Sequence, residues 1–210
     1  MDITIRQLGK KFRKEWIFKN FDYSFKSGNR YAITGPNGIG KSTLLQIISG
    51  FMPSTSGEVI YYSENNAVIH NDQIYRYIAF SGPYLELIEE FTLKEMIKFH
   101  FKFKNPVNKF GLEELVNKMS LTDAINKPIK AFSSGMKQRL KLGLVFFSEV
   151  PVLLLDEPTT NLDDFGVKWY INEINLLPKN RLILVSSNLK REYSFCNKVL
   201  DLEHYKLNRF

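Results

Sequence analysis

The chain has 210 residues, 44% of them hydrophobic, and its 29 basic and 22 acidic residues give a formal net charge of +7. This composition predicts a globular protein with a full core and excludes a disordered chain. The apolar runs are much shorter than the roughly 20 residues of a membrane-spanning helix. The first residues form no secretory signal, and the single Cys196 excludes an internal disulfide framework. We therefore expect a cytoplasmic protein in which Cys196 is a packing residue.

The first thirty residues predict strands with one buried face, because hydrophobic and polar residues alternate around Ile3 and Ile5 and again from Phe21 to Phe25. The densest basic patch lies between these two segments. It is either a contact for nucleic acid or anionic lipid, or a solvated hairpin that happens to be basic. We favour the solvated hairpin and expect no nucleic-acid partner. The patch comprises Lys10, Lys11, Arg13 and Lys14.

Residues 35–42 match the phosphate-loop pattern G-x-x-x-x-G-K-[ST] at every fixed position. Glycines let such a loop point its backbone N–H groups at phosphates, Lys41 reaches the terminal phosphates, and the Ser42 hydroxyl can hold Mg²⁺. The run 30–34 predicts a strand before the loop and 43–48 a helix after it, a context that argues against a chance glycine-rich turn. The predicted nucleotide site comprises Gly35, Pro36, Asn37, Gly38, Ile39, Gly40, Lys41, Ser42 and Thr43.

Further elements follow in chain order. Strands are expected at 58–62 and 75–80, with a polar turn at 63–66 between them. Thr92 and Glu95 form a capping-box pattern that predicts the start of a helical insert, which ends near Pro128 and suggests a second lobe. Helices are then expected at 135–147 and 164–177, and buried strands at 152–155 and 182–186. The histidines lack metal-ligand spacing, so no zinc site is expected.

The strand expected at 152–155 ends on two carboxylates, Asp156 and Glu157. Ligands bind at this end of the strands in parallel α/β sheets. Asp156 is placed to hold Mg²⁺ through its water shell, and Glu157 is the candidate general base for the water that attacks the γ-phosphate. The alternative is that the two acids only solvate a sheet edge.

A third motif lies at the start of the helix expected at 135–147. Ser133 followed by Gly135 offers a hydroxyl, bare backbone N–H groups and a helix dipole, which together can bind a γ-phosphate. The alternative is that this segment is only a helix cap.

These motifs resemble those of the nucleotide-binding subunit of an ATP-binding-cassette (ABC) transporter, over nearly the whole chain. Residues 132–136 take the place of the family's L-S-G-G-Q signature, and residues 156–163 resemble its acidic strand end and D-loop. The resemblance implies that Phe12 stacks on adenine and that two ATP molecules lie between two head-to-tail cassettes. In that arrangement the second copy's ATP faces Ser133, Ser134, Gly135 and Met136, and the D-loop comprises Asn161, Leu162 and Asp163.

The resemblance also implies the fold. We expect an α/β protein with a P-loop NTPase core, a mixed sheet, an N-terminal antiparallel β lobe and a small helical insert. All of 1–210 would form one ABC ATPase domain, with its nucleotide-binding core at 1–83 and 150–210 and its helical subdomain at about 84–149.

Three positions depart from the family pattern. Ser134 and Met136 alter the signature, and Ser81-Gly82-Pro83 stands where the family has a glutamine that binds Mg²⁺ and senses the membrane partner. Asn188 stands where the family has its switch histidine. Asparagine can donate a hydrogen bond but carries no charge, and losing one transition-state donor costs about 10²–10³ in rate. We therefore expect slow but real ATP hydrolysis, with Glu157 and Asn188 as catalytic residues.

The leading interpretation is the ATP-binding subunit of an ABC transporter, which uses ATP and Mg²⁺ as a homodimer or heterodimer. It would lie on the inner face of the cell membrane, docked on a separate membrane permease subunit near residues 84–91, although that segment could instead be an exposed amphipathic connector. Two alternatives remain. One is a binding-only cassette paired with a competent partner. The other is a soluble cassette protein acting on ribosomes or DNA, suggested only by the basic charge balance.

Overall fold

The computed structural model describes residues 1–205, and the chain divides into two compact units. The first unit combines Met1–Phe80, Pro151–Asp156 and the described part of Pro178–Phe210. The second combines Ser81–Val150 and Glu157–Leu177. It therefore contains the segment 84–149 that the sequence assigns to a helical subdomain, and also the helix that follows Glu157.

An antiparallel sheet of the first unit has the strand order β2-β1-β4-β5. Ile3 and Ile5 on β1 and Phe21 and Phe25 on β2 are buried, as their alternation predicts. The register between β1 and β2 shifts three times between Ile5 and Lys11, because bulges interrupt the pairing. The strands are β1 (Asp2–Phe12), β2 (Glu15–Phe25), β4 (Ser56–Tyr62) and β5 (Val68–Ile69).

The second sheet has the strand order β6-β7-β8-β3-β9, with β3 paired in parallel to both β8 and β9 and β7 paired in parallel to β8. Every residue of β7 and β8 is buried, which explains why these strands are continuous hydrophobic runs rather than alternating ones. The strands are β3 (Arg30–Thr34), β6 (Ile78–Ser81), β7 (Val152–Asp156), β8 (Leu182–Ser186) and β9 (Lys198–Asp201).

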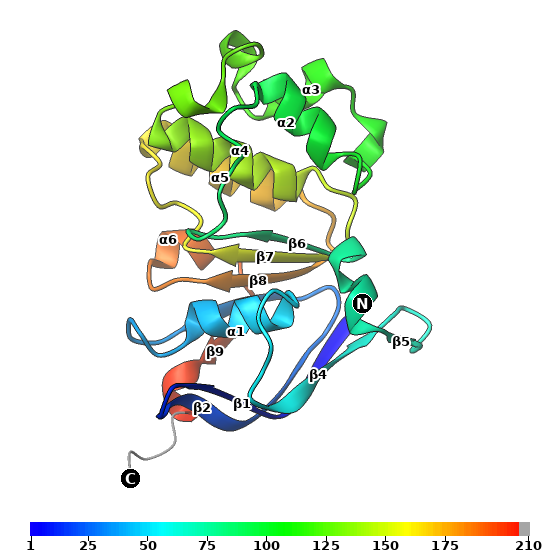
Figure 1. Ribbon diagram of the computed structural model, residues 1–210, viewed down its shortest axis with the longest axis vertical. Coiled ribbons are helices and arrows are strands. Elements are labelled where there is room, and N and C mark those ends of the chain that lie inside the picture. The colour runs from blue at the N-terminus through cyan, green and yellow to red at the C-terminus, as the bar shows by residue number, and fades with distance from the viewer. Residues whose placement is uncertain (206–210) are drawn as a thin grey trace. The chain divides into compact units, whose positions relative to one another are not determined.

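Helix α1 (Lys41–Ile48) follows β3 and lies between the two sheets of the first unit (Figure 1). Leu44, Leu45 and Ile48 are at most 1% exposed and belong to the core that also includes residues of both sheets. Removing this apolar area from water stabilises the unit and fixes the helix. The remaining elements of this unit are the short helix α6 (Lys190–Tyr193) and the 3₁₀ turns η1 (Asn71–Arg76) and η5 (Leu202–Tyr205).

The second unit is helical. The predicted capping box at the start of α2 is confirmed, since Glu95 N–H donates to Thr92 Oγ1 at 3.3 Å and Thr92 N–H donates to Glu95 Oε2 at 2.8 Å. Helices α4 and α5 pack together through Phe146, whose ring centroid lies 6.0 Å from those of Trp169 and Tyr170. The helices are α2 (Leu93–His100), α3 (Leu112–Lys118), α4 (Ser134–Phe146) and α5 (Asp164–Leu176), with 3₁₀ turns η2 (Val107–Lys109), η3 (Thr122–Ala124) and η4 (Ile129–Ala131).

The strand predicted at 75–80 is wrong at its beginning. Residues up to Arg76 belong to η1, and the strand starts only at Ile78. Only Ile74 of η1 is buried, while Tyr75 is 51% exposed and lies beside the Arg76 side chain. The aromatic residue that suggested a strand is thus a surface residue.

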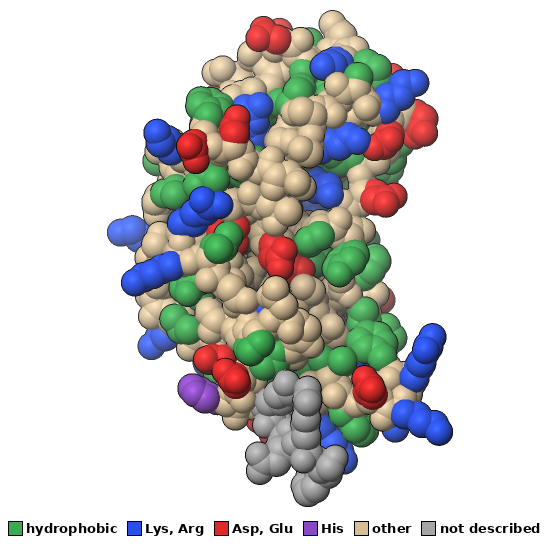
Figure 2. Space-filling model, turned by 90° about the vertical axis from the view of Figure 1, so that its left-hand side faces the viewer, with side chains coloured by type: hydrophobic (Ala, Val, Ile, Leu, Met, Phe, Trp, Pro, Cys, Tyr) green, Lys and Arg blue, Asp and Glu red, His purple; other side chains and the backbone are tan. Residues whose placement is uncertain are grey.

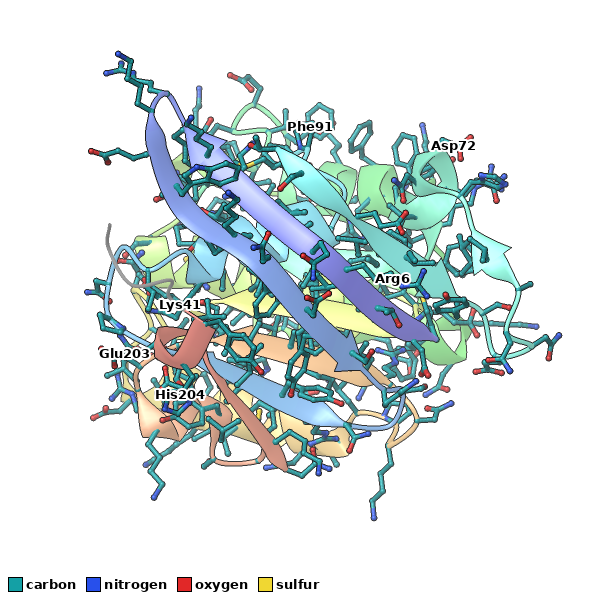
Figure 3. The ribbon with its side chains drawn as sticks, turned by 90° about the horizontal axis from the view of Figure 1, so that it is seen from below. Arg6, Lys41, Asp72, Phe91, Glu203 and His204 are labelled. Carbon is teal, nitrogen blue, oxygen red and sulfur yellow. The ribbon has the colours of Figure 1, made fainter. Side chains whose placement is uncertain are left out.

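The basic patch spans the end of β1, with Lys10 and Lys11, and the turn to β2, with Arg13 and Lys14; this hairpin end projects from the sheet in Figure 3. Arg13 and Lys14 are exposed, as expected for a solvated hairpin. Lys10 differs from that expectation, because it is only 9% exposed and its Nζ donates to the Pro53 carbonyl at 2.7 Å. On the face shown in Figure 2, basic side chains are dispersed among acidic and uncharged ones.

Candidate nucleotide-binding site

The loop between β3 and α1 has the backbone conformation of a phosphate cradle. Gly35, Gly38 and Gly40 all have positive φ, at 131°, 79° and 111°. Gly40 is constrained in a second way, because a Cβ atom there would lie 2.5 Å from Ile17 Cγ2 on β2. Glycine at position 40 therefore lets β2 approach the start of α1 closely.

Lys41, labelled in Figure 3, is the first residue of α1. Its side chain is buried, with 7% of the residue exposed. Its Nζ donates to the carbonyl oxygens of Gly35 at 2.7 Å and Pro36 at 3.3 Å. The ammonium group thus lies against the loop itself, at the positive end of the helix. A triphosphate in the loop would meet both this charge and the helix N-terminus.

Two oxygen-bearing side chains of the first unit are suited to Mg²⁺. Ser42 is half-buried in the first turn of α1, and Asp156 is the last residue of β7, 1% exposed and paired in register with Ser186 of β8. A hydroxyl and a carboxylate are hard oxygen donors, the type that Mg²⁺ prefers. Residues 1–205 contain no cluster of three or more His, Cys, Asp or Glu side chains suited to a metal ion. Such a donor set fits an ion that takes its other ligands from phosphate and water.

Glu157 begins the part of the chain that follows β7, and its side chain is exposed. Its φ is +46°, a left-handed conformation that non-glycine residues rarely adopt. Thr160 N–H closes the turn onto the Glu157 carbonyl at 3.2 Å. Strain of this kind costs about 1–3 kcal/mol and occurs most often at functional sites.

The signature segment caps α4. Ser133 is the N-cap, and its Oγ accepts a hydrogen bond from Met136 N–H at 3.2 Å. Ser134 is exposed and Gly135 is half-buried, and a Cβ atom at Gly135 would lie 3.2 Å from the Asn161 carbonyl. The helix-cap interpretation is thus correct as geometry, and the cap leaves the N-terminal end of α4 beside the D-loop.

The predicted D-loop connects Glu157 to α5. Asn161 has a φ of +66°, and Leu162 N–H donates to the Thr159 carbonyl at 3.0 Å. Asp163 is the N-cap of α5, where its Oδ1 accepts from Gly166 N–H at 2.8 Å. The D-loop is therefore a folded turn whose acid is engaged in capping.

Sequence reasoning missed a link between α4 and the turn after Glu157. The buried Gln138 Nε2 donates to the Pro158 carbonyl at 2.8 Å. A polar residue at a buried position of α4 is the one signal that the sequence offered, and it does not name the partner. Gln138 thus ties the signature helix to the residue beside Glu157.

A second missed contact joins Asn188 to the phosphate loop. Asn188 follows β8, and its Nδ2 donates to Asn37 Oδ1 at 3.1 Å. The structure thereby brings Asn188, which the sequence predicts to stand in the place of a switch histidine, to the loop predicted to hold phosphates.

Other predicted residues lie as follows. Phe12 ends β1, is 44% exposed, and has Lys10 Nζ 5.0 Å from its ring centroid. Ser81 ends β6 and is 2% exposed, and Gly82 and Pro83 follow it. Burial raises the pKa of the Cys196 thiol to about 12, as expected for a packing residue.

Comparison with known proteins identifies the family. The pattern of the ABC transporter family matches residues 18–160. The uncharacterized ABC transporter ATP-binding protein YybJ of Bacillus subtilis is 28% identical over 98% of this chain and 94% of its own length. The lantibiotic transport ATP-binding protein SrtF of Streptococcus pyogenes is 32% identical over 90% of this chain and 81% of its own length.

Solved structures show the same fold. A putative ABC transporter ATP-binding protein from Pyrococcus furiosus has a TM-score of 0.79 at 21% identity and covers 99% of this chain and 100% of its own. The ATP-binding cassette MJ0796, solved as a dimer in a post-hydrolysis state with ADP and phosphate, has a TM-score of 0.80 at 21% identity, covering 95% of this chain and 93% of its own. These likenesses confirm the predicted α/β fold.

Proposed function

Because the chain belongs to the ABC transporter family, as an ATP-binding subunit, we propose that it binds ATP with Mg²⁺ in the loop 35–42 and hydrolyses it. The observation that carries this proposal is the geometry of the loop, in which glycines with positive φ lead into α1 and Lys41 Nζ lies on the loop carbonyls. Within residues 1–205, no helix has the length and apolar character needed to cross a membrane. In this proposal a separate membrane subunit carries out the transport.

Each residue of the site has a proposed role. Lys41 leaves the loop carbonyls to pair with the terminal phosphates, and Phe12 stacks on the adenine. Ser42 and Asp156 hold Mg²⁺, which when bound neutralises charge on the phosphates. Glu157 accepts a proton from the attacking water while the water oxygen forms a bond to the γ-phosphorus. The bond between the γ-phosphorus and the β–γ bridging oxygen breaks, which gives ADP and phosphate.

The signature and D-loop residues act in a dimer. We propose that the N-terminal end of α4 faces the γ-phosphate of ATP in a second cassette, either a copy of this chain or a related one. The exposed Ser134 and the N-terminal position of Ser133 and Gly135 on a 13-residue helix support this assignment. Residues 161–163 would carry the state of one site to the other through Gly135, which approaches the Asn161 carbonyl.

Hydrolysis is proposed to be slow, because Asn188 cannot supply the positive charge of a histidine and residues 81–83 lack a glutamine. Steady-state ATPase assays with Asn188→His should show a rate higher than wild type, by up to about 10²-fold. Glu157→Gln should bind ATP but not turn it over. If wild type and Glu157→Gln both bind ATP and are equally inactive, hydrolysis by this chain is disproved, and the binding-only cassette becomes the correct interpretation.

The membrane subunit is proposed to dock on the second unit near residues 84–91, which places the chain on the inner face of the membrane. Tyr84 is 73% exposed, and beyond this segment Phe99 and Phe103 are 37% and 61% exposed, with ring centroids 5.3 Å apart. Exposed aromatic residues of this density are typical of protein interfaces. Leu87→Arg should abolish co-purification with the membrane subunit, and full retention of the partner would place the docking surface elsewhere.

A further inference from the structure

The contact between Asn188 and Asn37 joins two segments far apart in the chain. Asn37 lies in the phosphate loop and Asn188 directly follows β8, and the Asn188 Nδ2 to Asn37 Oδ1 distance is 3.1 Å. Both residues belong to the first unit, and both side chains are exposed. The phosphate-loop pattern does not require asparagine at position 37, which is one of its variable positions.

The backbone around Asn188 is fixed on both sides. Ser187, 1% exposed, donates its N–H to the Ile33 carbonyl of β3 at 3.2 Å, and its Oγ accepts from Leu189 N–H at 2.8 Å. Since these bonds hold the main chain, the direction of the Asn188 amide depends on its side-chain torsions. The hydrogen bond to Asn37 favours the torsions that direct one amide N–H of Asn188 at the loop.

The chemistry of the amide explains what this selection achieves. A primary amide has two N–H donors, whereas a neutral imidazole has one. Asn188 can therefore hold Asn37 with one N–H and keep the other for a phosphate oxygen, at any pH. A neutral histidine at 188 has a single N–H and could not donate both to Asn37 Oδ1 and to a phosphate oxygen.

We propose that Asn37 is a positioning residue for Asn188, and that the pair acts as an uncharged, pH-insensitive sensor of the γ-phosphate. The proposal rests on the proposed function, because it needs ATP in the loop. One Asn188 N–H donates to Asn37 Oδ1, and the other donates to an oxygen of the γ-phosphate. The sensor thus distinguishes ATP from ADP through the second Asn188 N–H, which Asn37 orients toward the γ-phosphate.

The test measures nucleotide preference, which does not require turnover. Fluorescent ATP and ADP analogues are titrated with Mg²⁺ into full-length protein carrying Glu157→Gln, alone and with Asn37→Ala, Asn188→Ala or both. Losing a hydrogen bond to a charged group costs about tenfold or more in affinity, so Asn188→Ala should lower the ATP-over-ADP preference about tenfold. Asn37→Ala should lower it several-fold, and the double variant should resemble Asn188→Ala alone.

A second amide pair in the same unit provides a matched control. Asn197 Nδ2 donates to Asn29 Oδ1 at 3.2 Å, between the residue before β9 and the residue before β3. Asn29→Ala or Asn197→Ala should reduce stability without changing the nucleotide preference. A purely structural role for Asn37 would make Asn37→Ala behave in the same way.

A pH series completes the test. The ATP-over-ADP preference is divided by that of Asn188→Ala at each pH. For the protein that keeps Asn188 this ratio should stay constant between pH 6 and 8, whereas for Asn188→His it should change near pH 6.5. Independent, additive effects of Asn37→Ala and Asn188→Ala, or an unchanged preference in Asn37→Ala, would overturn the proposal. A different outcome would separate the two proposals. If the effects of Asn37→Ala and Asn188→Ala on nucleotide preference are coupled, but wild-type protein with Glu157 shows no ATP turnover, the proposed hydrolysis is disproved and the sensor is retained.

Discussion

The side-chain amide N–H of Gln138 on α4 donates to the carbonyl of Pro158, the residue directly after Glu157, at 2.8 Å. The bond is buried, so its loss leaves a carbonyl without a donor in a dry environment. Gln138→Met, which keeps the volume, should lower the free energy of unfolding by about 1–3 kcal/mol and reduce the ATPase rate by releasing the turn at Glu157. Urea unfolding and steady-state kinetics measure the two effects. Gln73→Met on the exposed face of η1 is the control, expected within about 0.5 kcal/mol of wild type.

The left-handed backbone of Glu157 predicts a difference between two inactive variants. Glycine adopts a φ of +46° at little cost, whereas alanine bears the same strain as glutamate. Glu157→Gly should therefore be more stable than Glu157→Ala by about 1 kcal/mol, in chemical denaturation without nucleotide. An alanine variant as stable as the glycine variant would show that the turn relaxes and that position 157 stores no strain.

Gly40 and Gly38 separate backbone strain from steric overlap. Both have positive φ, but a Cβ at Gly38 would meet nothing within 4 Å, while one at Gly40 would lie 2.5 Å from Ile17 Cγ2. Gly40→Ala should thus cost about 1–3 kcal/mol more in unfolding free energy than Gly38→Ala. Adding Ile17→Ala, which removes the clashing methyl, should lessen the penalty of Gly40→Ala. If the double variant shows only the sum of the two single penalties, the close approach of β2 is not the cause.

His100 predicts a pH dependence of stability in the second unit. Its Nε2 contacts Ser148 Oγ at 2.9 Å, and Ser148 Oγ donates to the Leu144 carbonyl at 2.6 Å. Burial above all, with the nearby charge of Lys104, lowers the pKa of His100 to about 4, from an ordinary value of 6.5. The unfolded chain therefore takes up the proton first as the pH falls. Stability from the neutral ring is complete above pH 7 and is lost between about 6.5 and 4.

The size of this loss is up to about 3 kcal/mol, because one pKa unit corresponds to about 1.4 kcal/mol. Unfolding free energies of wild type and His100→Gln, measured from pH 7 to 4.5, should differ in slope over that range. The glutamine variant keeps a donor for Ser148 but cannot titrate. Equal slopes in the two proteins would place the acid sensitivity in other residues.

Patterns local in the chain predicted their structures well. The phosphate loop is fixed by glycines, which adopt its positive φ values at little cost, and the Thr92–Glu95 capping box is complete within four residues. The strand predicted at Tyr75 was wrong because aromatic residues favour strands on average, whereas this tyrosine lies exposed in η1. The contacts of Gln138 with Pro158 and of Asn188 with Asn37 could not be predicted, since no pattern in one segment specifies a hydrogen-bond partner in another.

Strand β8 lies between β7, which ends on Asp156, and β3, which leads into the phosphate loop. Pairing with β8 therefore sets the positions of both strand ends. Two strand spacings of about 4.8 Å separate them, roughly 10 Å in all. This spacing is set by backbone hydrogen bonds and not by any side chain of the site. Substitutions at Lys41, Ser42 or Asp156 should therefore leave the spacing intact, whereas an insertion within β8 should shift the register of β8 against both neighbours and disturb the loop and the acid together.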